Sequence, residues 1–349
     1  MAKVLSHPDG KVALGGYADS IDLATGLNKD VPGLLAGLEK FSEPSVKEPA
    51  FAIVFWLGYD DFRFPAAQCK ALWARGIVPV LMIMPGWERQ VTDQRHSLEA
   101  IIAGELDGTI RRAANEASLA DADQYPLLVS FGWEVNNIWQ WAWAYDRSDG
   151  PTLYRQAYRR WVEVTRSEAG DCWSWLWMTG VNPEGAPRWN DSVHWYPGHD
   201  VVDWVGIGAH RNLGTFEVEM NRAVAELTPI SGLRDKHLIV ELSATVDGST
   251  FGARPTSPAD ALFRGRRANL RRGTRSLPVV SPEDKREYIE QSLYHLGHGS
   301  WPWPVSAASW WNGTEWNPTG GVDSSVECRD AWRWGLMSPQ FTSHVRTSA

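Results

Sequence analysis

Two glutamates stand at the carboxyl ends of short apolar runs that are typical of strands. Glu134 follows the run 126–131, and Glu241 lies near the end of the run 237–242. In a parallel barrel the carboxyl ends of all strands meet on one face, so two such carboxyl groups can come close together. Retaining cleavage of a glycosidic bond needs two carboxyl groups about 5–5.5 Å apart, one to protonate the leaving oxygen and one to attack the anomeric carbon. The pair therefore predicts glycosidase chemistry, although either glutamate alone would more often be a salt-bridge partner.

The neighbours of Glu134 favour the role of general acid. Such an acid must stay protonated near neutral pH, and apolar surroundings raise the pKa of a carboxyl group. Trp133 and Trp139 flank Glu134 and could supply those surroundings. Asn136 could bond sugar hydroxyls, or it could simply shape the turn after the strand.

Tryptophan is unusually frequent, at 21 of 349 residues. An indole can pack in the core, or it can stack on the apolar C–H face of a pyranose ring. Trp177 and the pair Trp310–Trp311 close strand-like runs, where a sugar could reach them. We interpret these three as binding candidates.

The elements that must position these residues alternate between strand-like and helical patterns. This alternation predicts an α/β fold, a single (β/α)8 TIM barrel with long βα loops. A doubly wound open sheet is the alternative, and the lack of a glycine-rich phosphate loop counts against a nucleotide-binding version of it. The eight predicted strands are 12–17, 51–57, 77–84, 126–131, 172–178, 201–207, 237–242 and 305–311.

Several helices have recognisable ends. Pro151 and Gly170 bracket a run with apolar residues spaced four, four and three apart, which predicts a helix between them. Ser281 followed by Pro282 and two acids is a typical helix start. The segments 105–117 and 216–227 also have helical patterns.

We expect one catalytic domain over residues 1–349, with an arginine-rich insertion at 251–280 after the seventh strand. The insertion contains seven arginines against one acid, Asp260. It is either a solvated loop or a cationic flap over an anionic substrate.

Composition excludes other classes of function. The net charge of −8 argues against a nucleic-acid-binding protein, and no apolar run is long enough to cross a membrane. The first eleven residues lack a signal-peptide core, so a cytoplasmic protein is expected, or a secreted one if a leader has been trimmed. Three scattered cysteines predict free thiols. We expect no metal and no cofactor.

Segments along most of the chain resemble glycoside hydrolase family 26, the β-mannanase family within a clan of retaining barrel glycosidases. The resemblance implies Glu134 as acid/base and Glu241 as nucleophile. It also suggests a tryptophan under the sugar in the cleavage subsite, at Trp310–Trp311. The segments are 101–107, 134–139, 175–177, 196–206 and 239–241.

Three positions depart from the family pattern. Trp133 stands where the family has His, Ser130 where it has Arg, and His210 where it has a Tyr that contacts the nucleophile. The family resemblance makes mannan the first candidate substrate. The three departures leave β-glucan, xylan or an anionic glycan as further candidates. A carbohydrate-binding barrel without catalysis, or a transglycosylase, is the alternative. The predicted substrate-binding residues are Trp133, Asn136, Trp139, Trp177, His210, Trp310 and Trp311.

Overall fold

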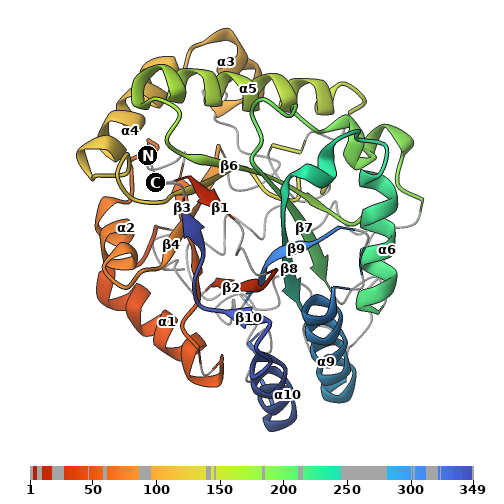
Figure 1. The fold of residues 1–349 in the computed structure, drawn as a ribbon. Helices are drawn as coiled ribbons and strands as arrows, with labels where there is room; N and C mark the ends of the chain where they lie inside the picture. Colours follow the sequence, from red (N-terminus) through yellow and green to blue (C-terminus); the bar gives the residue numbers. More distant parts are fainter. Residues whose placement is uncertain are drawn as a thin grey trace, which may run out of the picture.

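The fold is a closed barrel of eight parallel strands, which the computed structural model shows in Figure 1. Each strand pairs with the next along the chain, and pairing of β2 with β9 closes the ring. Closure confirms the predicted (β/α)8 barrel and excludes the open sheet. The strands are β2 (Val12–Tyr17), β3 (Phe51–Leu57), β4 (Val78–Met84), β5 (Leu128–Phe131), β6 (Ser174–Gly180), β7 (Trp204–His210), β8 (His237–Ser243) and β9 (Val305–Trp311).

The structure describes most of the chain but not all of it. For Leu5, His210 and Arg346 it describes the backbone alone. The arginine-rich segment 251–280, between β8 and α9, lies outside the described residues. The residues that the structure describes are 3–5, 10–17, 27–45, 47–57, 61–85, 96–138, 143–144, 147–182, 185–210, 215–244, 281–299, 301, 303–311, 321–322 and 324–347.

Helices surround the strands and bury their outer faces (Figure 1). The predicted ends of two helices are confirmed: Gly170 caps α5, and Ser281 and Asp284 form a capping box at the start of α9. No helix among the described residues is long and apolar enough to cross a membrane. The α-helices are α1 (Val31–Ser45), α2 (Ala66–Trp73), α3 (Leu98–Ala103), α4 (Asp107–Leu119), α5 (Gly150–Ala169), α6 (Phe216–Leu227), α9 (Pro282–His298) and α10 (Val326–Leu336); the 3-10 turns are η3 (Arg188–Asn190), η4 (Ser192–His194) and η5 (Leu233–Asp235).

Side chains fill the inside of the barrel. Alternate residues of each strand point inward, among them Ile53, Met82, Leu176, Met178 and Ile239. They leave a cavity of only about 10 Å³, room for about one water molecule. The barrel is therefore a packed core, and a substrate can reach it only at an end.

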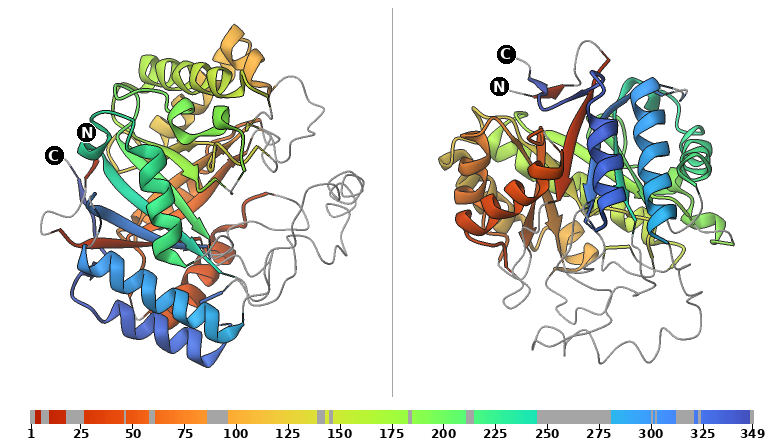
Figure 2. Two further views of the ribbon diagram at one scale, coloured as in Figure 1. Left: turned by 90° about the vertical axis from the view of Figure 1, so that its right-hand side faces the viewer. Right: turned by 90° about the horizontal axis from the view of Figure 1, so that it is seen from below.

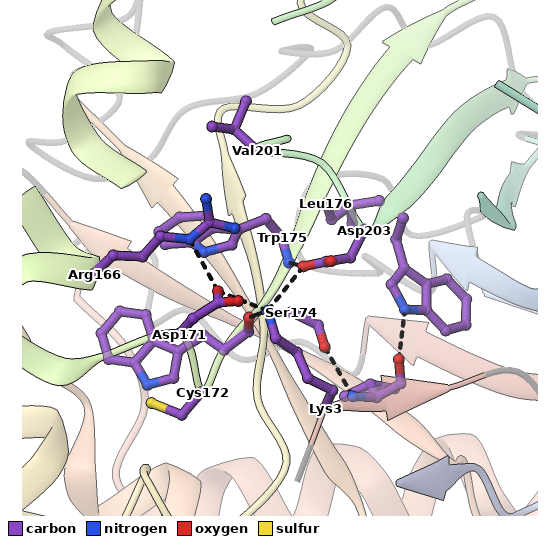
Figure 3. A network of polar contacts seen from close by, with 12 residues as sticks. Lys3, Arg166, Asp171, Cys172, Ser174, Trp175, Leu176, Val201 and Asp203 are labelled. Carbon is purple, nitrogen blue, oxygen red and sulfur yellow. Dashed lines mark hydrogen bonds and ion pairs between the residues drawn. The ribbon is translucent and has the colours of Figure 1, made fainter. Parts of the chain in front are cut away.

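A short antiparallel pair, β1 (Val4–Leu5) with β11 (Arg346–Thr347), joins the two ends of the chain, and β10 (Phe341–Thr342) pairs with the start of β2. Val4 N–H donates to Ser174 Oγ at 2.8 Å, at the first residue of β6. Figure 3 shows Lys3 close to Ser174. Its Nζ donates to Asp171 at 3.0 Å and to Asp203 at 3.3 Å. The amino-terminal segment thus closes the amino end of the barrel, opposite the end where barrel enzymes bind substrate.

Candidate active site

Glu134 lies in the turn that follows β5, at the carboxyl end of the barrel. Only 7% of its surface is exposed. Its φ of 44° is in the left-handed region, which non-glycine residues rarely adopt, and such strain often occurs at functional sites. The backbone N–H of Val135 donates to Met178 O on β6 at 3.2 Å, and the Asn137 amide donates to Glu134 Oε2 at 3.3 Å. These contacts fix the position of the carboxyl group.

Asn136 holds the same turn against the end of β6. Its Oδ1 accepts from the Gly180 N–H at 2.8 Å, and its Nδ2 donates to the Gly180 carbonyl at 2.9 Å. Gly180 also lies beside the acid, since a Cβ there would be in van der Waals contact with Glu134 Cβ at 3.6 Å. Asn136 is almost completely buried, and its amide is engaged by the backbone. The structure therefore places Asn136 as a support beside Glu134, and we leave it out of the sugar-binding set.

A second layer of polar groups supports Asn136 from behind. Asn190 Nδ2 donates to the Asn136 carbonyl at 2.7 Å and to Asn182 Oδ1 at 2.9 Å. Glu226 on α6 accepts at Oε2 from Ser192 Oγ at 2.7 Å and from Asn182 Nδ2 at 3.1 Å. Burial raises the pKa of Glu226, while the hydrogen bonds from Ser192 and Asn182 act against that rise. We call Asn182, Asn190, Ser192 and Glu226 the polar support.

Trp133, which precedes the acid, is packed between two other aromatic rings. Its ring centroid lies 5.5 Å from that of Phe55 and 4.7 Å from that of Trp143. Trp143 Nε1 donates to the Trp133 carbonyl at 2.9 Å, and a Cβ on Gly132 would lie 2.7 Å from the Trp143 ring. Gly132 has a φ of 67°, so both its conformation and its lack of a side chain are required. Trp133 is thus buried among aromatic rings, directly before Glu134 in the chain.

Glu241 points into the barrel from β8, with 6% of its surface exposed. It lines the central cavity together with Met178, Ile239 and Ser309. On the neighbouring strands it pairs in register with Gly208 of β7 and Ser309 of β9. Glu241 and Glu134 therefore come from strands separated by β6 and β7, both near the carboxyl end of the barrel.

An aromatic floor extends across this end of the barrel; we define it as Tyr17, Phe55, Trp133 and Trp311. Trp311 closes β9 and stacks on Tyr17 at the end of β2, with ring centroids 4.1 Å apart and planes 10° apart. Phe55 lies 5.7 Å from Tyr17 and 6.3 Å from Trp311. Among the described residues, the Trp311 Nε1–H has no hydrogen-bond acceptor. Trp311 as a whole is half-buried, whereas its Nε1 atom is buried.

Two members of this floor were missed in the sequence. Tyr17 and Phe55 looked like ordinary strand residues, since their strands are apolar on both faces. The available signal for Tyr17 was its position as the last residue of a predicted strand. Phe55 offered no comparable signal.

Two predicted binding tryptophans face away from the site. Trp177 is fully buried and packs on Tyr196, with centroids 5.1 Å apart. Trp310 is fully buried against Trp332 of α10 at 5.5 Å, under Lys285 Nζ at 5.6 Å. Both lie between the barrel and its helices, so we leave them out of the proposed binding set.

Two further predictions cannot be placed. Trp139 lies outside the described residues, and for His210 only the backbone, at the end of β7, is described.

Within the described part of the chain, no group of three or more His, Cys, Asp or Glu side chains could hold a metal ion. Cys69, Cys172 and Cys328 are buried free thiols, as the sequence predicted.

A family of known proteins matches part of the chain. Residues 88–246, which include both glutamates, match the model of glycosyl hydrolase family 26. A search of curated proteins found no match.

Solved structures share the fold at low sequence identity. A β-mannanase from Bacteroides ovatus is 16% identical with a TM-score of 0.59, and the match covers 95% of this chain and 90% of that one. A modular endo-β-1,4-mannanase from Cellulomonas fimi is 17% identical with a TM-score of 0.60, over 95% of this chain and 72% of that one. A mannanase from Bacillus subtilis is 13% identical with a TM-score of 0.57, over 97% and 88%. Residues 88–246 are therefore similar to glycosyl hydrolase family 26, and the chain shares the barrel fold of these solved structures.

Proposed function

We propose that this protein is a retaining glycoside hydrolase that cleaves a β-linked polysaccharide or oligosaccharide, with β-mannan as the first candidate. One observation carries the proposal: two buried carboxyl groups, Glu134 and Glu241, lie near the carboxyl ends of barrel strands within the segment that matches a glycosidase family. We also propose that the chain acts as one catalytic domain, in which 251–280 is an insertion.

The residues take complementary roles in the proposed reaction. Glu241 attacks the anomeric carbon while Glu134 protonates the leaving oxygen, and a glycosyl-enzyme forms on Glu241. Glu134 then takes a proton from water, which attacks the same carbon and releases Glu241. The Asn137 amide, which donates to Glu134 Oε2, orients this carboxyl group for the two proton transfers.

The aromatic floor is the proposed platform for the sugar being cleaved. Trp311 is the half-buried member of this floor, and its indole ring can stack on the apolar face of a pyranose. Mannan ranks first because the similar structures named above are mannanases. Trp133 and Ser130 change the contacts near the acid, so β-glucan, xylan and anionic glycans follow as candidates.

Substitution of each glutamate tests the proposal. We expect Glu134→Ala to lower kcat by about 10²–10⁴-fold, the usual contribution of a general acid. Glu241→Ala should lower it at least as much, because no glycosyl-enzyme can form. Reducing-end release is measured on β-mannan, β-glucan, xylan and a charged glycan. Glu168→Ala, an exposed position on α5, is the control.

The anomeric form of the first product tests retention. NMR spectra recorded early in the reaction should show the β-anomer, as expected for double displacement. Near-normal turnover in either glutamate variant would contradict the assignment. Binding of oligosaccharide without any product would favour the non-catalytic barrel, and transfer to an added sugar acceptor in preference to water would favour a transglycosylase.

A further inference from the structure

The outer wall of the barrel carries a groove between α9 and α10, which lie side by side (Figure 2). Its volume is about 460 Å³. The floor consists of Leu293, Gly297, Ala331 and Gly335. A Cβ on Gly335 would lie 2.3 Å from Leu293 Cδ1, so a larger residue there would force the helices apart. The groove therefore depends on small residues where the two helices meet.

Two exposed aromatic rings line this groove, one from each helix. Tyr294 of α9 is 59% exposed and Trp334 of α10 is 71% exposed. Tyr294 stacks on His298, with centroids 4.2 Å apart and planes 26° apart, and His298 Nδ1 lies 2.8 Å from the Tyr294 carbonyl oxygen. The Tyr294 ring is thus held in place before anything binds. Large aromatic side chains exposed together mark an interaction surface.

Charged groups surround the rings. Arg286 and Glu290 form an ion pair at 2.9 Å, and Glu327 and Asp330 lie on the facing helix. Carboxylates accept hydrogen bonds from hydroxyl groups, and guanidinium groups donate to hydroxyl oxygens. A pyranose presents both kinds of surface, an apolar C–H face for a ring and hydroxyls at its edge for charged groups.

The charge of the groove argues against a second copy of the chain as its occupant. A two-fold contact brings the same patch of both copies together. The acids Glu290, Glu327 and Asp330 outnumber the one lining arginine, so a two-fold contact would bury uncompensated negative charge from both copies, which is costly. A neutral glycan carries no such penalty and supplies the hydroxyl donors that these acids can accept from.

We propose that this groove is a second carbohydrate-binding site, which holds a β-linked polysaccharide on the barrel wall; the substrate class rests on the proposed function. Helices of this fold run back from the carboxyl end of the strands, so α9 starts near the rim where Glu241 lies. The lining extends from Arg286 in the second turn of α9 to His298 at its end. A chain in the groove can therefore run along the wall toward the catalytic end, which raises the local concentration of substrate.

Affinity electrophoresis of the full chain tests this site, in separate gels that contain galactomannan, mixed-linkage β-glucan or xylan. We expect Trp334→Ala and Tyr294→Ala each to raise the Kd for the retarding polysaccharide about fivefold, through loss of one stacking contact. Met337→Ala is the matched control, because Met337 follows α10 directly and is 61% exposed but does not line the groove. It should migrate like the unmodified protein.

Kinetics separate this site from the catalytic one. The ratio of kcat/KM on polysaccharide to kcat/KM on a tetrasaccharide should fall about fivefold in Trp334→Ala and stay constant in Met337→Ala. Unchanged Kd and ratio in both aromatic variants would overturn the second site while leaving the proposed hydrolase intact. Retardation that depends on Trp334 in a protein without hydrolytic activity would support the groove and reject the hydrolase. A dimer that Trp334→Ala dissociates in sedimentation would instead identify a contact between copies, and would also overturn the proposal.

Discussion

Both halves of the Asn136 amide are bound by the backbone of Gly180, at 2.8 and 2.9 Å. We expect Asn136→Ala to lower the free energy of unfolding by about 1–3 kcal/mol, because buried backbone groups lose their partners. The same change should lower kcat more than it alters KM, since Glu134 loses its support. Urea unfolding and steady-state kinetics measure the two effects.

Asn136→Asp is the closely matched variant. It keeps the shape and the acceptor for the Gly180 N–H, but it places an oxygen against the Gly180 carbonyl. We expect it to be destabilised as well. A raised KM at normal stability would mean that Asn136 contacts the sugar directly, as the sequence suggested.

At the scale of elements, α6 supports the catalytic end through the side chain of Glu226. Burial raises the pKa of this carboxyl group above its unfolded value. Its favourable contribution to stability is therefore fully present below the unfolded pKa and is lost as pH rises through the folded pKa. We expect Glu226→Gln, which keeps an acceptor for Ser192, to become more stable relative to the unmodified protein as pH rises from about 4 to about 8. Thermal unfolding across that range measures the difference.

Glu226→Ala provides the contrast. Without an acceptor, the Ser192 and Asn182 donors lose a partner at every pH, so this variant should be less stable throughout. A stability difference between Glu226→Gln and the unmodified protein that does not change with pH would contradict the raised pKa.

For the whole molecule, the amino-terminal strand should contribute to stability without affecting catalysis. Ser174→Ala removes the buried acceptor of the Val4 N–H, and we expect the melting temperature to fall by about 1–4 °C. Asp171→Asn, which weakens an exposed ion pair with Lys3, should change it much less. Because this network lies at the amino end, kcat/KM at 25 °C should be unchanged in both. A large loss of activity in Ser174→Ala would contradict this separation.

The sequence predicted the barrel well, because the apolar runs mark the strands and the capping residues mark the helices between them. It predicted the faces of the strands poorly. The predicted fifth strand stopped at residue 178, but β6 continues to Gly180, so Trp177 lies inside the strand and not at its end. Since Leu176 and Met178 point inward, Trp177 must point outward. A strand that is buried on both faces lacks the polar alternation that would reveal this.

The same limit applies to the pair Trp310–Trp311. One of the two must face the barrel and the other the helices, and the sequence alone does not say which. Ser309 lines the cavity, so Trp311 faces inward and Trp310 outward. The two glutamates were easier to predict, since a carboxylate after an apolar run needs a specific reason to be there.

The left-handed backbone at Glu134 has a consequence for engineering. The left-handed backbone conformation costs a residue with a side chain about 1–2 kcal/mol of folding free energy, whereas glycine adopts it without that cost. The replacement that relieves the backbone would also delete the proposed acid. Directed evolution that selects for heat resistance alone would therefore favour inactive variants at this position, and a screen for a hardier enzyme has to select for turnover as well.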